Sequence, residues 1–286
     1  MPKESDPILI TGATGKQGGS VANELLGAGR RVRIMTRHPD SAAAKQLAAR
    51  GAEVVKGDLD DPASLPKALE GAWATYAVQN TWEAGIEREE EQGKRFAEAA
   101  KNAGVQYYVY ASVASAQRET GIPHFDNKAR IEQRVKELGF PSWAVLRPAF
   151  FMENLLSPDN VSAIGQGQLP LGIKPTTKLQ MAAVQDIGKY GKLMFEQPER
   201  FNGRGIDIAS DELTMPEVAE VLTRVTKHPV SFVQVPVAEI RKFSEDLAVM
   251  LEWFDAVGYN ADIPGNAKEY GISPTSFADW AKAHFA

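Results

Sequence analysis

The chain has 286 residues and a net charge of −5, with 43% hydrophobic and 24% charged residues. This composition is ordinary for a soluble protein with a substantial core, folded as one large or two unequal domains. The absence of cysteine excludes disulfides, thiol catalysis and cysteine-ligated metals. The negative charge and the lack of a long basic run do not favour direct nucleic-acid binding. Four histidines without metal-ligand spacing do not indicate a zinc site.

The first seven residues, MPKESDP, are polar, and no apolar stretch reaches the length that spans a membrane. We therefore expect a cytoplasmic protein that does not engage a membrane.

Three glycines follow the first apolar run of the chain. The run at 8–10 is typical of a buried strand, and Gly12, Gly15 and Gly18 come after it. Gly12 permits a tight turn, Gly15 lets backbone amides approach a ligand, and Gly18 lets the next helix pack closely on the strand. That helix, expected at 16–26, would point its free N–H groups and positive dipole end at a pyrophosphate. A plain strand-to-helix turn is the alternative, but it needs only one glycine. The pattern predicts a dinucleotide-binding loop made of Gly12, Thr14, Gly15, Lys16, Gln17 and Gly18.

Strand-like and helical patterns alternate up to about residue 148. We expect strands at 8–11, 31–36, 53–56, 73–78, 106–111 and 142–147, and helices at 41–50, 62–70, 85–103 and 126–138. Strands separated by helices imply right-handed crossovers and a mostly parallel sheet. Asp60 or Asp61 before Pro62 is typical of a helix start, and Gly104 and Gly139 fit helix C-terminal positions. The predicted fold class is α/β, a Rossmann-type doubly wound parallel sheet, with the nucleotide-binding domain at residues 1–150.

The pattern changes after residue 148. Gly and Pro are dense from Ser157 to Pro175, which indicates a long, partly irregular segment, and Gly165, Gly167 and Gly172 would permit it to move. Beyond it we expect a strand and a helix over 178–195, a strand at 205–208, and helices from 214 or 215 to 226, at about 236–256 and at 274–285. Residues 151–286 are predicted to form a smaller α+β lobe. This lobe would close over the site and be partly interleaved with the sheet.

Thr36 and Arg37 end the second predicted strand, where NAD-preferring folds usually place an acidic residue for the ribose 2′-hydroxyl. A guanidinium can instead bind the 2′-phosphate of NADP through two charge-assisted hydrogen bonds. These are worth roughly 1.5–3 kcal/mol, a preference on the order of ten- to hundredfold. The alternative is a solvated surface arginine. We predict NADP(H) as cofactor, preferred over NAD(H).

Polar residues also follow the third and fourth predicted strands. Asp58 could accept a hydrogen bond from the adenine amino group while Leu59 packs on the ring, and a turn or capping aspartate is an equal alternative. Gln79 and Asn80 lie where the backbone would pass the riboses of the cofactor.

Hydride-transfer enzymes of this architecture carry a Tyr and, four residues later, a Lys on one face of a helix. The Lys holds the nicotinamide ribose and lowers the pKa of the Tyr, and a Ser near the end of the fifth strand orients the substrate carbonyl. Lys128 and Ser112 stand at these positions, but His124 replaces the Tyr. His124 could donate a proton, since the unperturbed pKa of histidine lies near neutrality. A packing or capping role for His124, a surface lysine and an ordinary strand-end serine are the alternatives.

Several stretches together resemble the NmrA-like family, atypical members of the short-chain dehydrogenase/reductase superfamily. They are TGATGKQG, the Thr36-Arg37 ending, the Gly57-Asp58 pair, PHFDNK and LRPAFFMEN. The resemblance covers nearly the whole chain and is specific in the first motif and from Pro123 to Asn154. It implies a Rossmann domain with a small C-terminal lobe, and NADP(H) as the ligand.

The resemblance also implies roles for single residues. Lys128 would bind the nicotinamide ribose, and Phe150, Phe151 and Asn154 would line the nicotinamide end of the site. The family commonly lacks the superfamily's Tyr, which agrees with His124.

Two functions are compatible with these residues. Some family members are thought to be redox-sensing regulators without enzymatic activity, and related branches reduce quinones or phenylpropanoid substrates. The missing Tyr and Cys favour an NADP(H)-binding sensor that biases contact with a regulatory protein partner. The alternative is an NADPH-dependent reductase of quinones, enones or other small carbonyl compounds. An apolar pocket for such a molecule could be lined by Phe150, Phe151, Leu155 and Trp82, and core packing between the lobes is the alternative for these residues. Quinone reduction can take its proton from water, so the missing Tyr does not exclude it.

Overall fold

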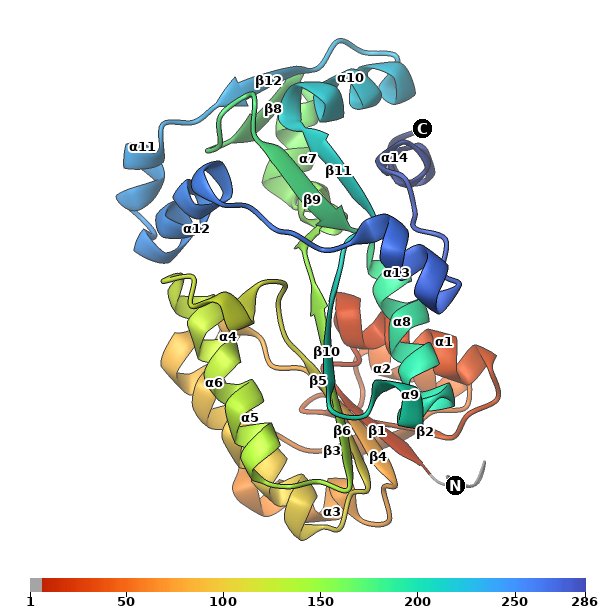
Figure 1. The fold of residues 1–286 in the computed structure, drawn as a ribbon. Helices are drawn as coiled ribbons and strands as arrows, with labels where there is room; N and C mark the ends of the chain where they lie inside the picture. The colour runs from red at the N-terminus through yellow and green to blue at the C-terminus, as the bar shows by residue number, and fades with distance from the viewer. Residues whose placement is uncertain (1–6) are drawn as a thin grey trace. The chain divides into compact units, whose positions relative to one another are not determined.

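The structure, a computed structural model, describes residues 7–286, and the chain divides into two compact units. The first unit comprises the chain up to Ala116, His124–Arg147 and Ile187–Ile206, and the second comprises Gln117–Pro123, Pro148–Asp186 and Asp207–Ala286. Figure 1 follows the chain through both. Residues 187–206, which the sequence pattern assigns to the C-terminal lobe, contribute to the first unit.

A seven-stranded sheet forms the centre of the first unit, in the order β10-β6-β5-β4-β1-β2-β3 (Figure 1). β1 pairs in parallel with β2 and β4, and β5 pairs in parallel with β4 and β6. The predicted doubly wound α/β fold is confirmed, and the strand order reverses between β1 and β4. The strands are β1 (Ile8–Thr11), β2 (Val32–Thr36), β3 (Glu53–Lys56), β4 (Ala74–Ala77), β5 (Tyr107–Ala111), β6 (Ser142–Pro148) and β10 (Arg204–Ile208).

Helices cover both faces of this sheet, with α1, α2 and α8 on one side and α3, α5 and α6 on the other (Figure 1). All predicted helices of this part are present, and α6 begins three residues earlier than expected, so it includes His124. The helices are α1 (Lys16–Gly27), α2 (Ala42–Ala49), α3 (Leu65–Leu69), α4 (Thr81–Ala84), α5 (Ile86–Asn102), α6 (Pro123–Glu137), α8 (Val184–Glu196) and α9 (Pro198–Phe201), with 3₁₀ turns at Pro62–Ser64 and Ala116–Arg118.

Local signals set several of these helix ends. The Asp61 side chain accepts a hydrogen bond from the Ala63 N–H at 3.1 Å, with Pro62 in the first turn, as predicted. Gly104 and Gly139 follow α5 and α6 with φ values of 78° and 62°, in the left-handed region that glycine adopts without strain. Both glycine predictions are confirmed.

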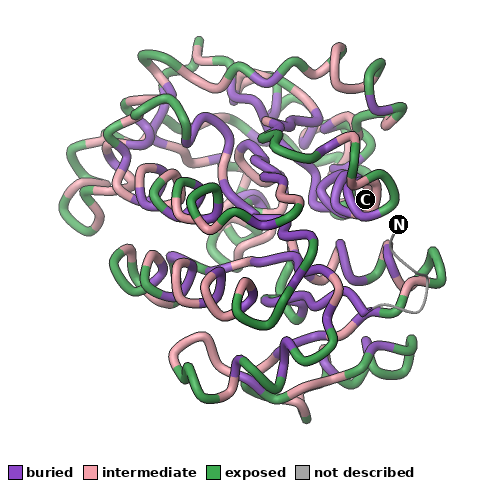
Figure 2. The backbone as a smooth tube through the Cα atoms, turned by 60° about the horizontal axis from the view of Figure 1, so that its bottom comes forward, coloured by how far each residue is buried: buried purple, intermediate pink, exposed green. Residues whose placement is uncertain are grey.

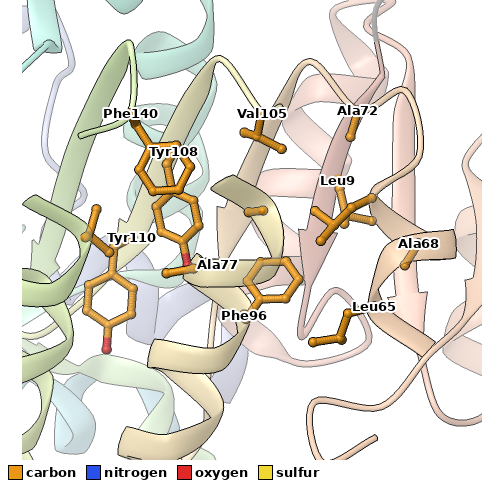
Figure 3. Packing of buried hydrophobic residues seen from close by; sticks show 14 of the residues in the cluster. Leu9, Leu65, Ala68, Ala72, Ala77, Phe96, Val105, Tyr108, Tyr110 and Phe140 are labelled. Carbon is orange, nitrogen blue, oxygen red and sulfur yellow. The ribbon is translucent and has the colours of Figure 1, made fainter. Parts of the chain in front are cut away.

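An apolar cluster lies between the sheet and the helices α3, α5 and α6. Leu9 from β1 and Tyr108 from β5 contribute to it together with Leu65 and Phe96 from the helices (Figure 3). The ring of Tyr108 stacks on Phe140 at a centroid distance of 4.7 Å. Each such side chain contributes about 1.5–3 kcal/mol through burial. Figure 2 shows the corresponding alternation of buried and exposed positions along the helices.

On the opposite face, α8 packs on α1 at positions without side chains. A Cβ at Gly188 would lie 2.3 Å from Ser20 Oγ, and a Cβ at Gly191 would lie 2.6 Å from a methyl of Val21. Glycine is therefore required for this close approach. The helix that follows the dinucleotide loop is held in place by a segment nearly 170 residues later in the chain.

The second unit contains two small sheets, ordered β11-β9-β7 and β12-β8. Its strands are β7 (Phe150–Phe151), β8 (Gln168–Leu171), β9 (Lys178–Ala182), β11 (Asp211–Thr214) and β12 (Ser231–Gln234). Its helices are α7 (Pro158–Gly165), α10 (Met215–Thr226), α11 (Val237–Arg241), α12 (Glu245–Ala256), α13 (Ile263–Tyr270) and α14 (Phe277–Phe285), with a 3₁₀ turn at Met152–Leu156. Thr214 and Glu217 form a reciprocal capping box at the start of α10.

The segment from Ser157 to Pro175 was expected to be partly irregular, and it is so at 166–167 and 172–175, but α7 and β8, which the sequence pattern does not predict, occupy most of it. Ser157 caps α7 by accepting a hydrogen bond from the Asn160 N–H at 3.3 Å. A Cβ at Gly172 would lie 2.4 Å from a methyl of Ile240, so this glycine allows close packing there. The stretch at 236–256 also divides into α11 and α12, and α13 is not predicted by the sequence pattern.

Within residues 7–286, no helix is long and apolar enough to cross a membrane. In the same range, no three His, Asp or Glu side chains are grouped so as to hold a metal ion.

Candidate functional site

Parallel pairing brings several predicted ligand residues to one edge of the first sheet. Because β1 pairs with both β2 and β4, Gly12, Arg37 and Gln79 follow the carboxyl ends of neighbouring strands. The hydroxyl of Thr11 ties β1 to β4, since it donates to the Val78 carbonyl at 2.8 Å and accepts from the Val78 N–H at 2.7 Å. This edge lies at the reversal of strand order, where open α/β sheets bind ligands.

The glycine turn after β1 leaves the start of α1 without a side-chain cap. Gly12 has φ +62°, and the N–H of Gly15 donates to the Gly12 carbonyl at 3.0 Å. A Cβ at Gly18 would lie only 2.5 Å from the Gly12 carbonyl oxygen, so glycine is needed for α1 to begin against this turn. Gly15 is the N-cap residue of α1 and, having no side chain, leaves the helix without a side-chain cap. An uncapped, positively polarised helix end next to a glycine turn suits a phosphate.

The other loop residues divide into two groups. Thr14 and Lys16 are exposed beside the turn. Gln17 is directed elsewhere, because its amide nitrogen lies 2.9 Å from the hydroxyl of Tyr76, a buried residue of β4. Burial raises the pKa of Tyr76 above its ordinary value, so this hydroxyl remains neutral. Gln17 therefore ties α1 to the sheet in this structure.

Gln79 provides the clearest sign that this edge of the sheet is built to bind a ligand. Its side chain is 5% exposed, and neither its amide nitrogen nor its amide oxygen has a hydrogen-bond partner within residues 7–286. A buried polar group left in this state costs about 1–3 kcal/mol. A ligand rich in hydroxyl and amide groups would satisfy it. Together with the glycine turn, this unpaired amide fits a dinucleotide at the sheet edge.

Arg37, predicted to bind a 2′-phosphate, forms an ion pair with Glu83 of α4. Both side chains are about half exposed. The hydrogen bond with Glu83 raises the pKa of Arg37 above its ordinary value, and the negative charges of Asp58 and Asp60 act in the same direction. Arg37 therefore carries a positive charge next to the carboxylates of Glu83, Asp58 and Asp60.

Asp58 stabilises a turn, which is one of the two roles that the sequence left open for it. Its carboxylate accepts a hydrogen bond from the Asp60 N–H at 3.0 Å, and its own N–H donates to Ser64 Oγ at 3.0 Å. Leu59 is half-buried and packs against the apolar cluster of the sheet. A contact of Asp58 or Leu59 with adenine stays a prediction.

The residues after Gln79 form the short helix α4. Asn80 Oδ1 accepts a hydrogen bond from the Trp82 N–H at 3.1 Å and so caps this helix, which leaves Asn80 in a structural role here. The ring of Trp82 is 65% exposed and lies 5.3 Å, between centroids, from the ring of the buried His124. An exposed indole beside a histidine offers a flat apolar surface for a ring-containing molecule.

Lys128 belongs to a buried polar cluster. Its ammonium forms an ion pair with the carboxylate of Glu89, a residue of α5 that has no exposed surface. Glu89 also accepts hydrogen bonds from Thr81 and, at 2.7 Å, from the Asn127 amide. Asn127 Oδ1 has no partner of its own within residues 7–286. This cluster holds Lys128 in one place, with 13% of its side chain exposed.

Ser112 is engaged in a second network. Its hydroxyl donates to Glu132 at 2.6 Å, and Glu132 also accepts two hydrogen bonds from Arg147, at 2.8 and 2.5 Å. All three side chains are buried. A Cβ at Gly205 would lie 2.6 Å from the Arg147 guanidinium carbon, so β10 leaves space for that group. In this arrangement the hydroxyl proton of Ser112 is already donated to Glu132. Orientation of a substrate carbonyl by Ser112 stays a prediction.

Phe150 and Asn154 lie in the second unit, Phe150 on β7 and Asn154 in the 3₁₀ turn that follows. Phe150 is half-buried and Asn154 is exposed. The carbonyl of Asn154 accepts a hydrogen bond from the Asn160 amide at 2.9 Å. Their roles at the nicotinamide end of the site stay predictions.

The sequence pattern does not predict Glu83 or Glu89, the two carboxylates that hold the candidate cations. Glu89 precedes Gly93 and Phe96 on the buried face of α5, at four and seven residues. A charged residue in register with an apolar helix face is therefore the signal that identifies it. Glu83 is exposed and carries no such signal.

The family model of the NmrA-like family matches residues 4–282. An NmrA-like family domain-containing oxidoreductase from Cladobotryum is 31% identical over 245 residues, which cover 77% of this chain and 73% of the relative. Among solved structures, an NADPH-dependent quinone oxidoreductase from Escherichia coli, crystallised with NADPH, has a TM-score of 0.83 at 23% identity and covers 98% of this chain and 100% of that one. The negative transcriptional regulator NmrA in complex with NADP has a TM-score of 0.81 at 21% identity and covers 99% and 96%.

Both solved structures share the fold of this chain. The family match extends over nearly all 286 residues. The protein therefore belongs to the NmrA-like family.

Proposed function

We propose that the first unit binds NADP(H) at the carboxyl edge of its sheet and that the protein is a redox-sensing regulator in the cytoplasm. The buried, unpaired amide of Gln79 next to the glycine turn carries the binding proposal. Its donor and acceptor match the hydroxyl-rich ribose portion of a dinucleotide. The likeness to NmrA, a negative transcriptional regulator crystallised in complex with NADP, supports the regulatory part.

The residues at the edge have complementary tasks in this proposal. The N-terminus of α1 faces the pyrophosphate, Arg37 binds the 2′-phosphate, and Lys128 binds the nicotinamide ribose. The bound nicotinamide would supply hydride chemistry, and its redox state would be the signal. Glu89 fixes the ammonium of Lys128, so the ribose meets a cation that is already oriented.

Sensing is favoured over catalysis by the state of the candidate proton donors. Ser112 donates to Glu132, and Lys128 is held by Glu89. His124 stands where reductases of this architecture carry Tyr. A protein that binds the cofactor but has no proton donor dedicated to a substrate is suited to report NADPH and NADP⁺ levels, provided that it binds the two forms with different affinities.

A reductase of quinones, enones or related carbonyl compounds is the second candidate. The exposed ring of Trp82 beside His124 favours it, since this surface can accept a flat acceptor molecule. The Cladobotryum relative is an NmrA-like oxidoreductase, and the Escherichia coli neighbour is an NADPH-dependent quinone oxidoreductase. His124 or water would then supply the proton.

One experiment separates the two functions. Nicotinamide absorbance is followed with NADPH and a panel of quinones, enones and aldehydes, while NADPH binding is measured by calorimetry in the same preparation. A sensor binds NADPH and gives no turnover above background. Turnover that disappears in Lys128→Ala would instead establish the reductase and make His124→Ala the next variant.

The cofactor assignment has its own test. In Arg37→Ala, the affinity for NADPH should fall on the order of ten- to hundredfold while that for NADH changes little, because only NADPH carries the 2′-phosphate. Equal losses for the two nucleotides would remove Arg37 from the 2′-phosphate site.

A further inference from the structure

The cation assigned to the 2′-phosphate already has an anionic partner on the protein. Arg37 follows β2, and Glu83 comes from α4, forty-six residues later in the chain. α4 contains only four residues, is capped by Asn80, and ends at Gly85, whose φ of 82° and ψ of 164° are readily adopted only by glycine. The fold therefore builds a separate short element that places a carboxylate on Arg37.

The neighbouring carboxylates have other partners. Asp60 accepts hydrogen bonds from Arg88 at 2.9 and 2.6 Å, and Asp58 accepts one from the Asp60 N–H. Glu83 thus differs from them, because its carboxylate lies on the guanidinium itself. A phosphate that binds the guanidinium through Nη2 would meet this carboxylate there.

Resting on the proposed function, we propose that Glu83 is a specificity-determining residue that competes with the 2′-phosphate of NADP(H) for Arg37. NADP(H) can form its bonds to the guanidinium only after the pair with Glu83 opens. NAD(H), which lacks the phosphate, leaves the pair intact. Glu83 therefore lowers the ratio of NADP(H) affinity to NAD(H) affinity below the value that Arg37 alone would give.

The size of the effect follows from exposure. Both side chains of the pair are about half exposed, and water and salt screen such pairs. Removing the competitor should therefore strengthen NADPH binding about two- to fivefold. The gain should shrink at high salt.

The experiment measures the dissociation constants of NADPH and NADH for the full chain and for Glu83→Gln by calorimetry. Glu83→Gln should tighten NADPH binding about two- to fivefold and leave NADH binding nearly unchanged. Glu87→Gln is the matched control, because it removes the same charge from an exposed position four residues later, at the start of α5. It should alter neither affinity.

A double-mutant cycle with Arg37→Ala identifies the route. If Glu83 acts by occupying Arg37, Glu83→Gln has no effect on NADPH binding in the Arg37→Ala background. Three results would overturn the inference: unchanged NADPH affinity in Glu83→Gln, an equal gain in Glu87→Gln, or a gain that persists without Arg37. If the unaltered chain binds neither nucleotide, the proposed function fails as well, so the two failures are distinguishable.

Discussion

Two buried carboxylates of the first unit hold a cation in different settings. Glu132 on α6 is 2% exposed and binds Arg147 through two hydrogen bonds, with the Ser112 hydroxyl as a third donor. Glu89 on α5 has no exposed surface and binds Lys128 with two further donors. Lys128 and Glu132 are one helical turn apart on α6. Each network thus joins a buried carboxylate to one cation and one hydroxyl donor, and the Glu89 network adds the Asn127 amide.

The difference lies in the cation. The Arg147 side chain is 8% exposed and packs against Gly205. The Lys128 side chain is 13% exposed, and its cluster contains the Asn127 side-chain oxygen, which has no hydrogen-bond partner within residues 7–286. A closed network serves stability, and a network with unfilled bonding capacity can serve a ligand. This contrast separates structural from functional ion pairs more clearly than burial alone.

Removal of Arg147 should produce the largest effect. Arg147→Ala leaves the Glu132 charge buried without its cation, which should lower the free energy of unfolding by about 3–5 kcal/mol. Urea denaturation measures the loss. Arg130→Ala is the matched control, since Arg130 on α6 pairs with Glu90 on α5 but is half exposed, and it should cost less than about 1 kcal/mol. Similar losses in the two variants would contradict a special role for the closed network.

Removal of Lys128 should weaken cofactor binding and should cost less stability than removal of Arg147. Lys128→Ala should weaken NADPH binding on the order of ten- to hundredfold, because a charge-assisted hydrogen bond to the ribose is lost. Thr81 and Asn127 still bind Glu89, so the cost in unfolding free energy should stay near 1–3 kcal/mol. Calorimetry and urea denaturation on the same preparation give both numbers. A stability loss as large as that of Arg147→Ala, with unchanged NADPH affinity, would place Lys128 among the structural cations.

A smaller effect is expected from the residue that positions Lys128. Glu89→Gln keeps the shape of the side chain but loses the charge that orients the ammonium, so NADPH affinity should fall about two- to tenfold. In the Lys128→Ala background the same substitution should have no further effect on binding. An effect that persists in that background would mean that Glu89 acts on the cofactor by another route.

The fold was largely predictable because its signals are local and periodic. Gly12, Gly15 and Gly18 follow an apolar run, and the alternation of strands and helices up to residue 148 is regular. The elements after Ser157 were not predictable from composition. Pro158 lies in the first turn of α7, and Gly172 packs closely against Ile240 just after β8. Residue type alone does not distinguish these uses from a loop.

The candidate cations were predictable, but their partners were not. Arg37 and Lys128 stand at fixed distances from strand ends and helix starts, so a local pattern identifies them. Glu83 and Glu89 meet them from elements 46 and 39 residues away, and such pairings depend on how helices pack. Glu89 can be recognised afterwards by its register with the apolar face of α5, whereas nothing in the sequence marks Glu83.

Asp60 extends the comparison to a carboxylate near the surface, and it should give the smallest effect. Arg88 and Gln92 donate to it, and the hydrogen bond from Arg88 is the main reason that the pKa of Asp60 lies below its ordinary value of 3.8. A carboxyl group with a lowered pKa in the folded state stabilises the fold above its unfolded pKa, and this stabilisation is lost as pH falls through the folded pKa.

Asp60→Asn should therefore have a lower urea midpoint than the unaltered chain at pH 7, and the difference should shrink towards pH 3. Asp40→Asn is the control, since Asp40 is fully exposed and 4.0 Å from Lys45, and it should shift the midpoint little at either pH. A difference between Asp60→Asn and the unaltered chain that stays constant with pH would mean that Asp60 stabilises the fold through packing or neutral hydrogen bonds. The charge of this near-surface carboxylate would then contribute less to stability than the charges of Glu89 and Glu132 in the two buried networks.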